Sequence, residues 1–170
     1  QGARILSEVL PTALVNLPES LRKRLIVTQQ AREEDIDAVR KTYAGSQIDV
    51  TLASFIDDIP ERLRDCHLVI ARSGASTVAE LTAAGRPGFL IPLPHAIDDH
   101  QRYNAQQIED AGGAWLMPQD RFGSEAVTDR LTKLLTNPAA LSRAAKAAKN
   151  SGRANAAERL ADMVLDMLGL

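Results

Sequence analysis

The stretch from Leu68 to Pro92 constrains the fold more than any other part of the chain. Its sequence predicts a buried strand over Leu68–Ala71, a tight turn of small residues, a helix over Ala75–Ala84 and a second strand over Gly88–Ile91. An apolar strand, a turn, a short helix and a further apolar strand make a βαβ unit. Because such a unit pairs its strands in parallel, we expect a parallel sheet covered by helices.

The rest of the chain repeats this alternation of helices and strands. Helices are expected over residues 5–16, 33–43, 60–66, 102–111, 124–135, 139–149 and 154–168, strands over 24–28, 48–52 and 114–117, and a polar loop over 93–101. Pro11 lies inside the first helix and predicts a kink or a new turn there. The fold class is therefore α/β, with a Rossmann-like, doubly wound parallel sheet and helices on both faces. In such sheets, ligands bind beyond the carboxyl ends of the strands.

The turn between the first strand and the helix of the βαβ unit has the features of an anion site. Gly74 has no Cβ and lets the backbone approach a ligand. Ala75, Ser76 and Thr77 supply amides and hydroxyls at the positive end of a helix dipole, which suits a phosphate or diphosphate. Glu80 lies one turn further on, where its carboxylate can accept a hydrogen bond from a sugar hydroxyl. The alternative is a tight turn in which a Ser or Thr side chain caps its own helix.

Composition excludes several other classes of protein. The 170 residues suit one domain, and a net charge of −2 without a dense basic stretch gives no support to nucleic-acid binding. No apolar run approaches the roughly 18 residues of a membrane helix. The single cysteine, Cys66, rules out an internal disulfide framework and fits a reducing cytoplasm.

Four short segments carry a family resemblance. They are Gln1-Gly2-Ala3-Arg4, Phe55-Ile56-Asp57-Asp58, Arg72-Ser73-Gly74-Ala75-Ser76-Thr77-Val78-Ala79-Glu80 and Asp98-Asp99-His100-Gln101 with Asn104-Ala105. In this order they resemble the MurG family of GT-B glycosyltransferases (family 28), which complete the lipid-linked disaccharide of peptidoglycan. The resemblance covers nearly the whole chain and corresponds to the C-terminal, donor-binding half of a two-domain fold. The start of the chain looks like the middle of a motif, so we expect an N-terminal acceptor domain to be missing and residues 1–170 to form the donor domain.

The resemblance implies a site for UDP-GlcNAc without metal or cofactor. The backbone of Ile56 holds the uracil, the amides of Ala75, Ser76 and Thr77 hold the diphosphate, and Glu80 binds the ribose. Gln101, with His100 beside it, reaches the GlcNAc hydroxyls. The full set of substrate-binding residues is Ile56, Ser73, Gly74, Ala75, Ser76, Thr77, Val78, Ala79, Glu80, His100, Gln101 and Asn104.

The same resemblance implies the reaction and its surroundings. GlcNAc passes with inversion from UDP-GlcNAc to the C4 hydroxyl of undecaprenyl-diphospho-MurNAc-pentapeptide, which the missing domain binds. The general base also belongs to that domain, so no catalytic residue is assigned to this chain and the chain alone is expected to be inactive. The full-length protein is expected at the cytoplasmic side of the bacterial plasma membrane, as a peripheral protein.

Several alternatives stay open at the level of sequence. Asp98, Asp99 and His100 could be a metal site, but two adjacent carboxylates and one His are a poor ligand set, and a solvated loop with sugar contacts is the other interpretation. His95 is either a catalytic base or a structural loop residue. The chain could also be a stand-alone donor subunit of an Alg13-like two-chain transferase, a non-catalytic UDP-sugar-binding module, or half of a GT-B-like epimerase.

Overall fold

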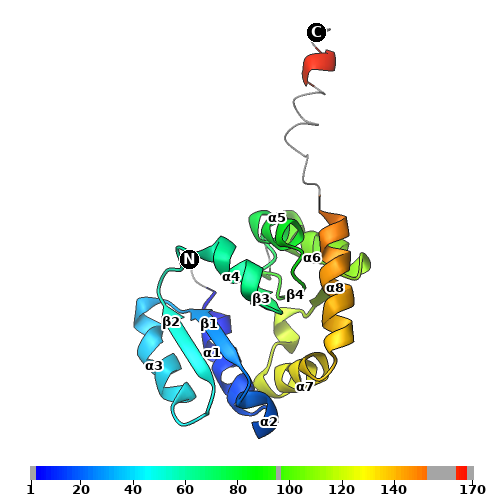
Figure 1. Cartoon of the computed structure of the whole chain (residues 1–170). Helices are drawn as coiled ribbons and strands as arrows, with labels where there is room; N and C mark the ends of the chain where they lie inside the picture. The colour runs from blue at the N-terminus through cyan, green and yellow to red at the C-terminus, as the bar shows by residue number, and fades with distance from the viewer. Residues whose placement is uncertain (1–2, 95–96, 153–163, 168–170) are drawn as a thin grey trace.

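Parallel strands and helices alternate along the chain (Figure 1). The structure is a computed structural model that describes residues 3–94, 97–152 and 164–167. The strands are β1 (Ile26–Gln30), β2 (Asp49–Ala53), β3 (Val69–Ala71), β4 (Gly88–Leu90) and β5 (Ala114–Leu116). The helices are α1 (Arg4–Val15), α2 (Glu19–Arg22), α3 (Glu33–Tyr43), α4 (Ile59–Asp65), α5 (Ala75–Ala84), α6 (His100–Asp110), α7 (Ser124–Leu135) and α8 (Pro138–Ser151), with 3-10 turns η1 (Ile97–Asp99) and η2 (Gln119–Arg121).

The strands form two hydrogen-bonded ladders, and every pairing is parallel. β1 pairs with β2, and β4 pairs with β3 on one side and β5 on the other. The register aligns Ala71, Leu90 and Leu116, so β3, β4 and β5 end at one edge. Within the described residues, β1 and β3 each have a strand partner on one side only. The predicted parallel α/β arrangement is confirmed, but the strands are divided between two ladders.

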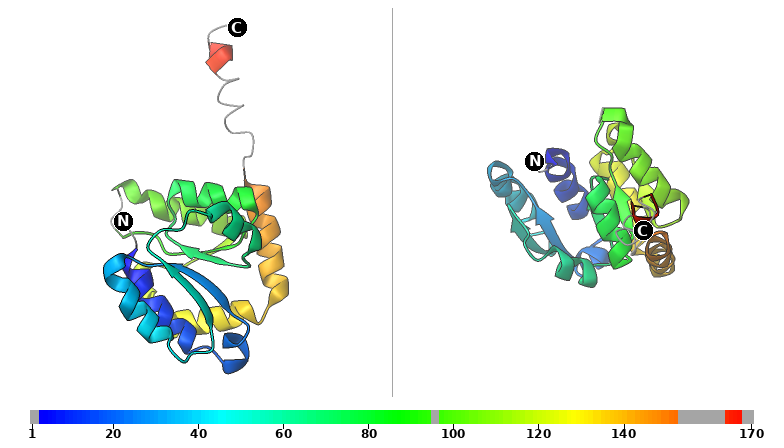
Figure 2. Two further views of the ribbon diagram at one scale, coloured as in Figure 1. Left: turned by 60° about the vertical axis from the view of Figure 1, so that its left-hand side comes forward. Right: turned by 90° about the horizontal axis from the view of Figure 1, so that it is seen from above.

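Helices lie on both sides of the strand layer, as the left view of Figure 2 shows. On one side α1 packs against α3 and α7, and on the other α5 packs against α6 and α8. Each side has its own apolar core. The first core takes Leu10 and Leu14 from α1 and Phe89 from β4, whereas the second takes Leu81 from α5 and Ile108 from α6. β4 contributes to both cores, because Phe89 and Leu90 point to opposite sides of the layer.

Most of the expected elements are present, and the differences have local causes. α3, α5 and α7 have the predicted bounds. α1 continues through Pro11, which is buried, so the predicted kink or new turn does not break the helix. β1 begins two residues later than predicted, because the amides of Arg24 and Leu25 bond back to the carbonyls of Leu21 and Arg22 at the end of α2.

The predicted loop after β4 is shorter than expected. η1 occupies Ile97–Asp99, and α6 begins at His100 rather than at Arg102. Asp98 and Asp99 reach this helix through the left-handed region, with φ values of 53° and 50°. Aspartate tolerates this conformation better than most residues. Most of the helix predicted over 154–168 lies outside the described residues. The part that is described, residues 164–167, is helical.

No helix in the described part of the chain is both long and apolar enough to cross a membrane. The longest, α8, has 14 residues, whereas a span needs about 20.

Candidate functional site

The N-terminus of α5 presents backbone amides that no side chain of the described residues caps. Gly74 is the N-cap residue, in an extended conformation, and within residues 3–94, 97–152 and 164–167 no side-chain hydrogen bond caps this end. The first intrahelical bond runs from the amide of Val78 to the carbonyl of Gly74, at 3.0 Å. The amides of Ala75, Ser76 and Thr77 precede that bond and point out of the helix end. The self-capped turn left open by the sequence is therefore wrong, and three donors stand at the positive end of the helix dipole.

The hydroxyl of Ser73 has a different use. Ser73 is fully buried, and its Oγ donates to the backbone carbonyl of Gln101 at 2.7 Å. In return, Nδ2 of Asn104 donates to the carbonyl of Ser73 at 3.1 Å. These two bonds join the β3–α5 turn to the first turn of α6. The structure therefore brings Ser73 together with Gln101 and Asn104, which lie 28 and 31 positions further along the chain and which the sequence predicted for the same site.

The side chain of Gln101 is oriented by the loop after β4. Its Oε1 accepts a hydrogen bond from the amide of Leu93 at 3.0 Å. Because a backbone N–H can only donate, the atom of Gln101 that faces Leu93 must be the oxygen. The Nε2 group of Gln101, with its two donor hydrogens, is left on the other side of the amide.

Arg72 links the ends of three strands, and the sequence did not single it out as a site residue. It directly follows β3, and its Nη1 donates to the carbonyls of Ile91 and Pro92, at 3.1 and 2.9 Å, just beyond β4. Its Nη2 donates to Oε1 of Gln119 at 2.6 Å, just beyond β5. Burial lowers the pKa of the Arg72 guanidinium from its ordinary value. An arginine directly after a buried strand was the signal available in the sequence, but its partners are not visible there.

The other predicted residues are more scattered. Glu80 is exposed on α5 and makes no ion pair or hydrogen bond with the described residues, so its carboxylate is available to a ligand. Val78 packs against the second core, and its amide is used inside α5, so it supports the helix. Ala79 is exposed, and His100 is exposed at the first position of α6. Ile56 is half-buried and lies three residues beyond the end of β2. It therefore follows the β1–β2 ladder, whereas α5 follows a strand of the β3–β4–β5 ladder.

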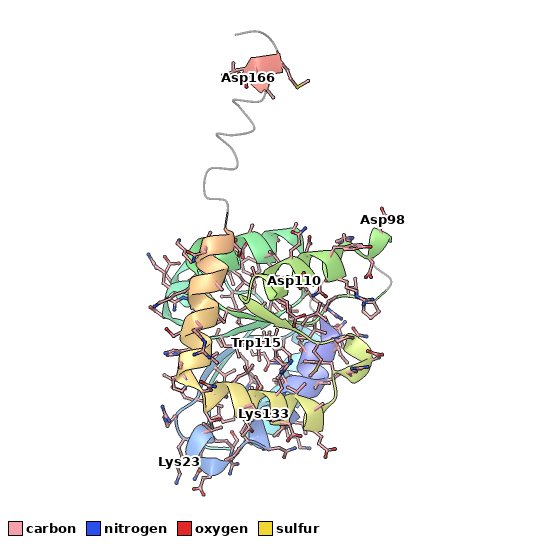
Figure 3. All side chains as sticks on the ribbon, turned by 90° about the vertical axis from the view of Figure 1, so that its right-hand side faces the viewer. Lys23, Asp98, Asp110, Trp115, Lys133 and Asp166 are labelled. Carbon is pink, nitrogen blue, oxygen red and sulfur yellow. The ribbon has the colours of Figure 1, made fainter. Side chains whose placement is uncertain are left out.

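Asp98 projects at the edge of the domain, far from Trp115 on β5 (Figure 3). In its neighbour Asp99, Oδ2 lies 3.9 Å from Nη1 of Arg102, which makes a loose ion pair at the surface. Within the described part of the chain, no group of three His, Cys, Asp or Glu side chains is placed to hold a metal ion. His95, which the sequence left between two roles, lies outside the described residues.

An open groove of about 620 Å³ runs along the same strand ends. It is lined by Pro92, Leu93, Pro94, Asp99, Arg102, Leu116, Pro118, Gln119, Asp120 and Arg121. Two of these residues, Leu93 and Gln119, are the ones held by Gln101 and Arg72. The hollow therefore borders the edge at which an α/β sheet binds its ligands.

Comparison with known proteins identifies the family. The Glycosyltransferase family 28 C-terminal domain matches residues 1–160. The chain belongs to this family. Two relatives are the UDP-N-acetylglucosamine--N-acetylmuramyl-(pentapeptide) pyrophosphoryl-undecaprenol N-acetylglucosamine transferases of Paramagnetospirillum magneticum and Rhodospirillum centenum. They are 58% and 56% identical to the chain over 99% and 100% of its length. The chain spans about 45% of the length of each.

Solved structures agree with the family 28 assignment. Acinetobacter baumannii MurG matches 97% of the chain with a TM-score of 0.87 and 31% sequence identity, and the match covers 47% of that protein. The glycosyltransferase VinC matches 87% of the chain with a TM-score of 0.67 at 16% identity, which shows a shared fold only. The predicted resemblance to the MurG family and the predicted fold, a half of a GT-B enzyme, are thus confirmed.

Proposed function

We propose that this chain is the donor-binding domain, residues 1–170, of an inverting glycosyltransferase of peptidoglycan synthesis. The reaction moves GlcNAc from UDP-GlcNAc to the C4 hydroxyl of undecaprenyl-diphospho-MurNAc-pentapeptide. The observation that carries the proposal is the uncapped N-terminus of α5, with the amides of Ala75, Ser76 and Thr77 unused within the helix. The names of the two family 28 relatives support the choice of donor and acceptor.

The geometry suits the stabilisation of a departing diphosphate. When the bond between GlcNAc and UDP breaks, negative charge develops on the diphosphate oxygens. Backbone amides fixed at a helix N-terminus stabilise that charge without having to reorganise during the reaction, and they do so without a metal ion. The hydrogen bond from the Ser73 hydroxyl to the backbone of α6 ties down the turn that carries these amides.

Glu80 and Ile56 complete the nucleoside side of the proposed site. The Glu80 carboxylate stands one helical turn from Ser76 on the exposed side of α5, where it can accept hydrogen bonds from the ribose hydroxyls. The backbone of Ile56, beyond β2, pairs with the edge of the uracil. Gln101, with His100 beside it, reaches the GlcNAc.

We assign neither the binding of the acceptor substrate nor its deprotonation to this chain. Removal of the proton from the acceptor hydroxyl needs a base, and we assign none within residues 1–170. We therefore expect the chain alone to bind the donor and to transfer no sugar. We assign the acceptor to an N-terminal domain, and the full-length protein to the cytoplasmic face of the plasma membrane.

Calorimetry on the chain tests the proposal. UDP-GlcNAc is expected to bind more tightly than GDP-mannose, and equal affinities would contradict the uracil and GlcNAc assignment. Glu80→Ala is expected to weaken UDP binding by about 1–3 kcal/mol, the usual cost of a lost hydrogen bond to a charged group. Glu125→Ala, the same change at an exposed glutamate of α7, serves as the control and is expected to leave the affinity unchanged. Unchanged affinity in the Glu80 variant would remove this residue from the site.

A further inference from the structure

One continuous path of hydrogen bonds connects the far strand β5 to the side chain of Gln101. Gln119, just beyond β5, accepts from Arg72, and Arg72 donates to the carbonyls of Ile91 and Pro92. The next amide along the chain, that of Leu93, donates to Oε1 of Gln101. The position of the Leu93 amide therefore depends on Arg72 and Gln119, which form no hydrogen bond with Gln101 among the described residues.

We propose that Arg72, together with Gln119, is a positioning residue that fixes the side-chain amide of Gln101 as a pure hydrogen-bond donor toward a bound sugar. A free glutamine side chain offers both a donor and an acceptor and can exchange them by a half-turn. Here the Leu93 amide occupies the acceptor, so only the Nε2 hydrogens remain for a ligand. The proposal rests on the proposed function, in which Gln101 contacts the GlcNAc.

A donor-only contact makes the site selective for a sugar oxygen that accepts a hydrogen bond at that place. Such a contact discriminates between sugars, because a donor that a bound ligand removes from water without pairing costs more than a matched donor gains. The fork of Arg72 is suited to this task. A planar guanidinium can hold two adjacent carbonyls and a side-chain amide at fixed angles, which a lysine ammonium cannot do.

The first experiment needs no ligand. Gln119→Leu removes one acceptor of Arg72, and Gln119 takes no part in the hydrogen bond between Leu93 and Gln101. We expect hydrogen exchange of the Leu93 amide, followed by NMR, to become roughly three- to tenfold faster, while the amides of β4 stay protected. Gln107→Leu, the same substitution on the exposed side of α6, is the control and should change neither. Unchanged exchange at Leu93 in the Gln119 variant would overturn the positioning role.

The second experiment measures the preference for UDP-GlcNAc over UDP by calorimetry. A positioning role predicts that Arg72→Lys and Gln119→Leu lower this preference roughly three- to tenfold and leave the affinity for UDP itself unchanged. A merely structural role would weaken both ligands alike, and that result counts against the proposal. Gln101→Glu keeps an acceptor for Leu93 but has no donor, so it should lose the preference as well.

A double-mutant cycle decides whether Gln119 acts through Gln101. In a Gln101→Ala background, Gln119→Leu is expected to have no further effect on the preference for UDP-GlcNAc. If the two substitutions instead lower the preference additively, and the parent chain prefers UDP-GlcNAc, the positioning role is overturned. A parent chain that binds neither ligand would instead overturn the proposed function, and with it the sugar-facing role of Gln101, so the two failures are distinguishable.

Discussion

Gly113 offers a sharp test of how α8 is held against the rest of the domain. A Cβ added at Gly113 would stand 2.8 Å from both Cα and N of Ala148 and 3.0 Å from its Cβ. Ala148 is fully buried in the last turn of α8, so the obstacle is the backbone of a helix and not the end of a flexible side chain. Gly113→Ala must therefore push α8 away from the α6–β5 connection.

The magnitude follows from two opposing effects. Overpacking of this kind costs about 1–3 kcal/mol. The backbone of Gly113 is not in the left-handed region, so alanine would by itself stabilise the chain by about 0.4–1 kcal/mol through the unfolded state. At the middle of the two ranges, the clash exceeds this gain by about 1.3 kcal/mol. At about 2–4 °C per kcal/mol for a chain of this size, we expect the midpoint of thermal unfolding to fall by about 3–5 °C.

Thermal unfolding followed by circular dichroism measures this effect. Gly123→Ser is the matched control, because no atom of the described residues lies within 4 Å of a Cβ at Gly123. Gly123 is the N-cap residue of α7, a position that serine favours. Its midpoint should be unchanged or higher. A Gly113→Ala protein that melts at or above the temperature of the parent would refute the close packing between Gly113 and α8.

Two further predictions concern buried hydroxyls. Ser73→Ala removes the bond to the Gln101 carbonyl and should lower the free energy of unfolding by about 0.5–1.5 kcal/mol in a urea titration, whereas a Ser76→Ala control stays within about 0.5 kcal/mol. Tyr43 donates to Gln29 at 2.7 Å, and burial raises the pKa of its phenol well above its ordinary value of 10. The neutral phenol is therefore favoured in the folded chain, so its contribution to stability is complete below pH 10 and is lost as the pH rises further. Tyr43→Phe should cost about 1 kcal/mol at pH 7 and reduce the loss of stability above pH 10; an unaltered alkaline profile would contradict this role of Tyr43.

Local signals in the sequence were sufficient to predict the helices that are bounded by a capping residue, a glycine or a proline. α5 ends where Gly85 takes a left-handed conformation, with φ 65°, which an apolar helix followed by glycine predicts. α8 begins at Pro138, after Asn137, whose side chain caps it. The same signals failed at α6. His100 and Gln101 are polar and follow a proline-rich loop, so nothing local indicates that a helix has begun.

In the candidate site, too, features set by neighbouring residues could be predicted from the sequence, whereas contacts between distant residues could not. The tight turn at Gly74 and the helix after it could be predicted, because glycine and small residues before a helix are a local pattern, whereas the sequence left open whether a side chain caps that helix. The role of Arg72 could not, since its partner Gln119 is 47 positions away and only the fold brings the two together. The tie between Ser73 and the backbone of Gln101 is equally invisible, because a carbonyl carries no signature in the sequence.

The three hydrogen bonds of the Arg72 guanidinium also have a consequence for the order in which the domain assembles. Its three acceptors lie beyond β4 and beyond β5, so the last of them exists only when the chain has been synthesised as far as Gln119. Closing contacts over such separations costs chain entropy, which the short-range contacts of α5 do not require. The helix that presents the amides can thus form early, whereas the loops that surround it are fixed only after β5 has joined its ladder. On this geometry, the proposed donor site is complete only when residues from β3 to Gln119 have come together.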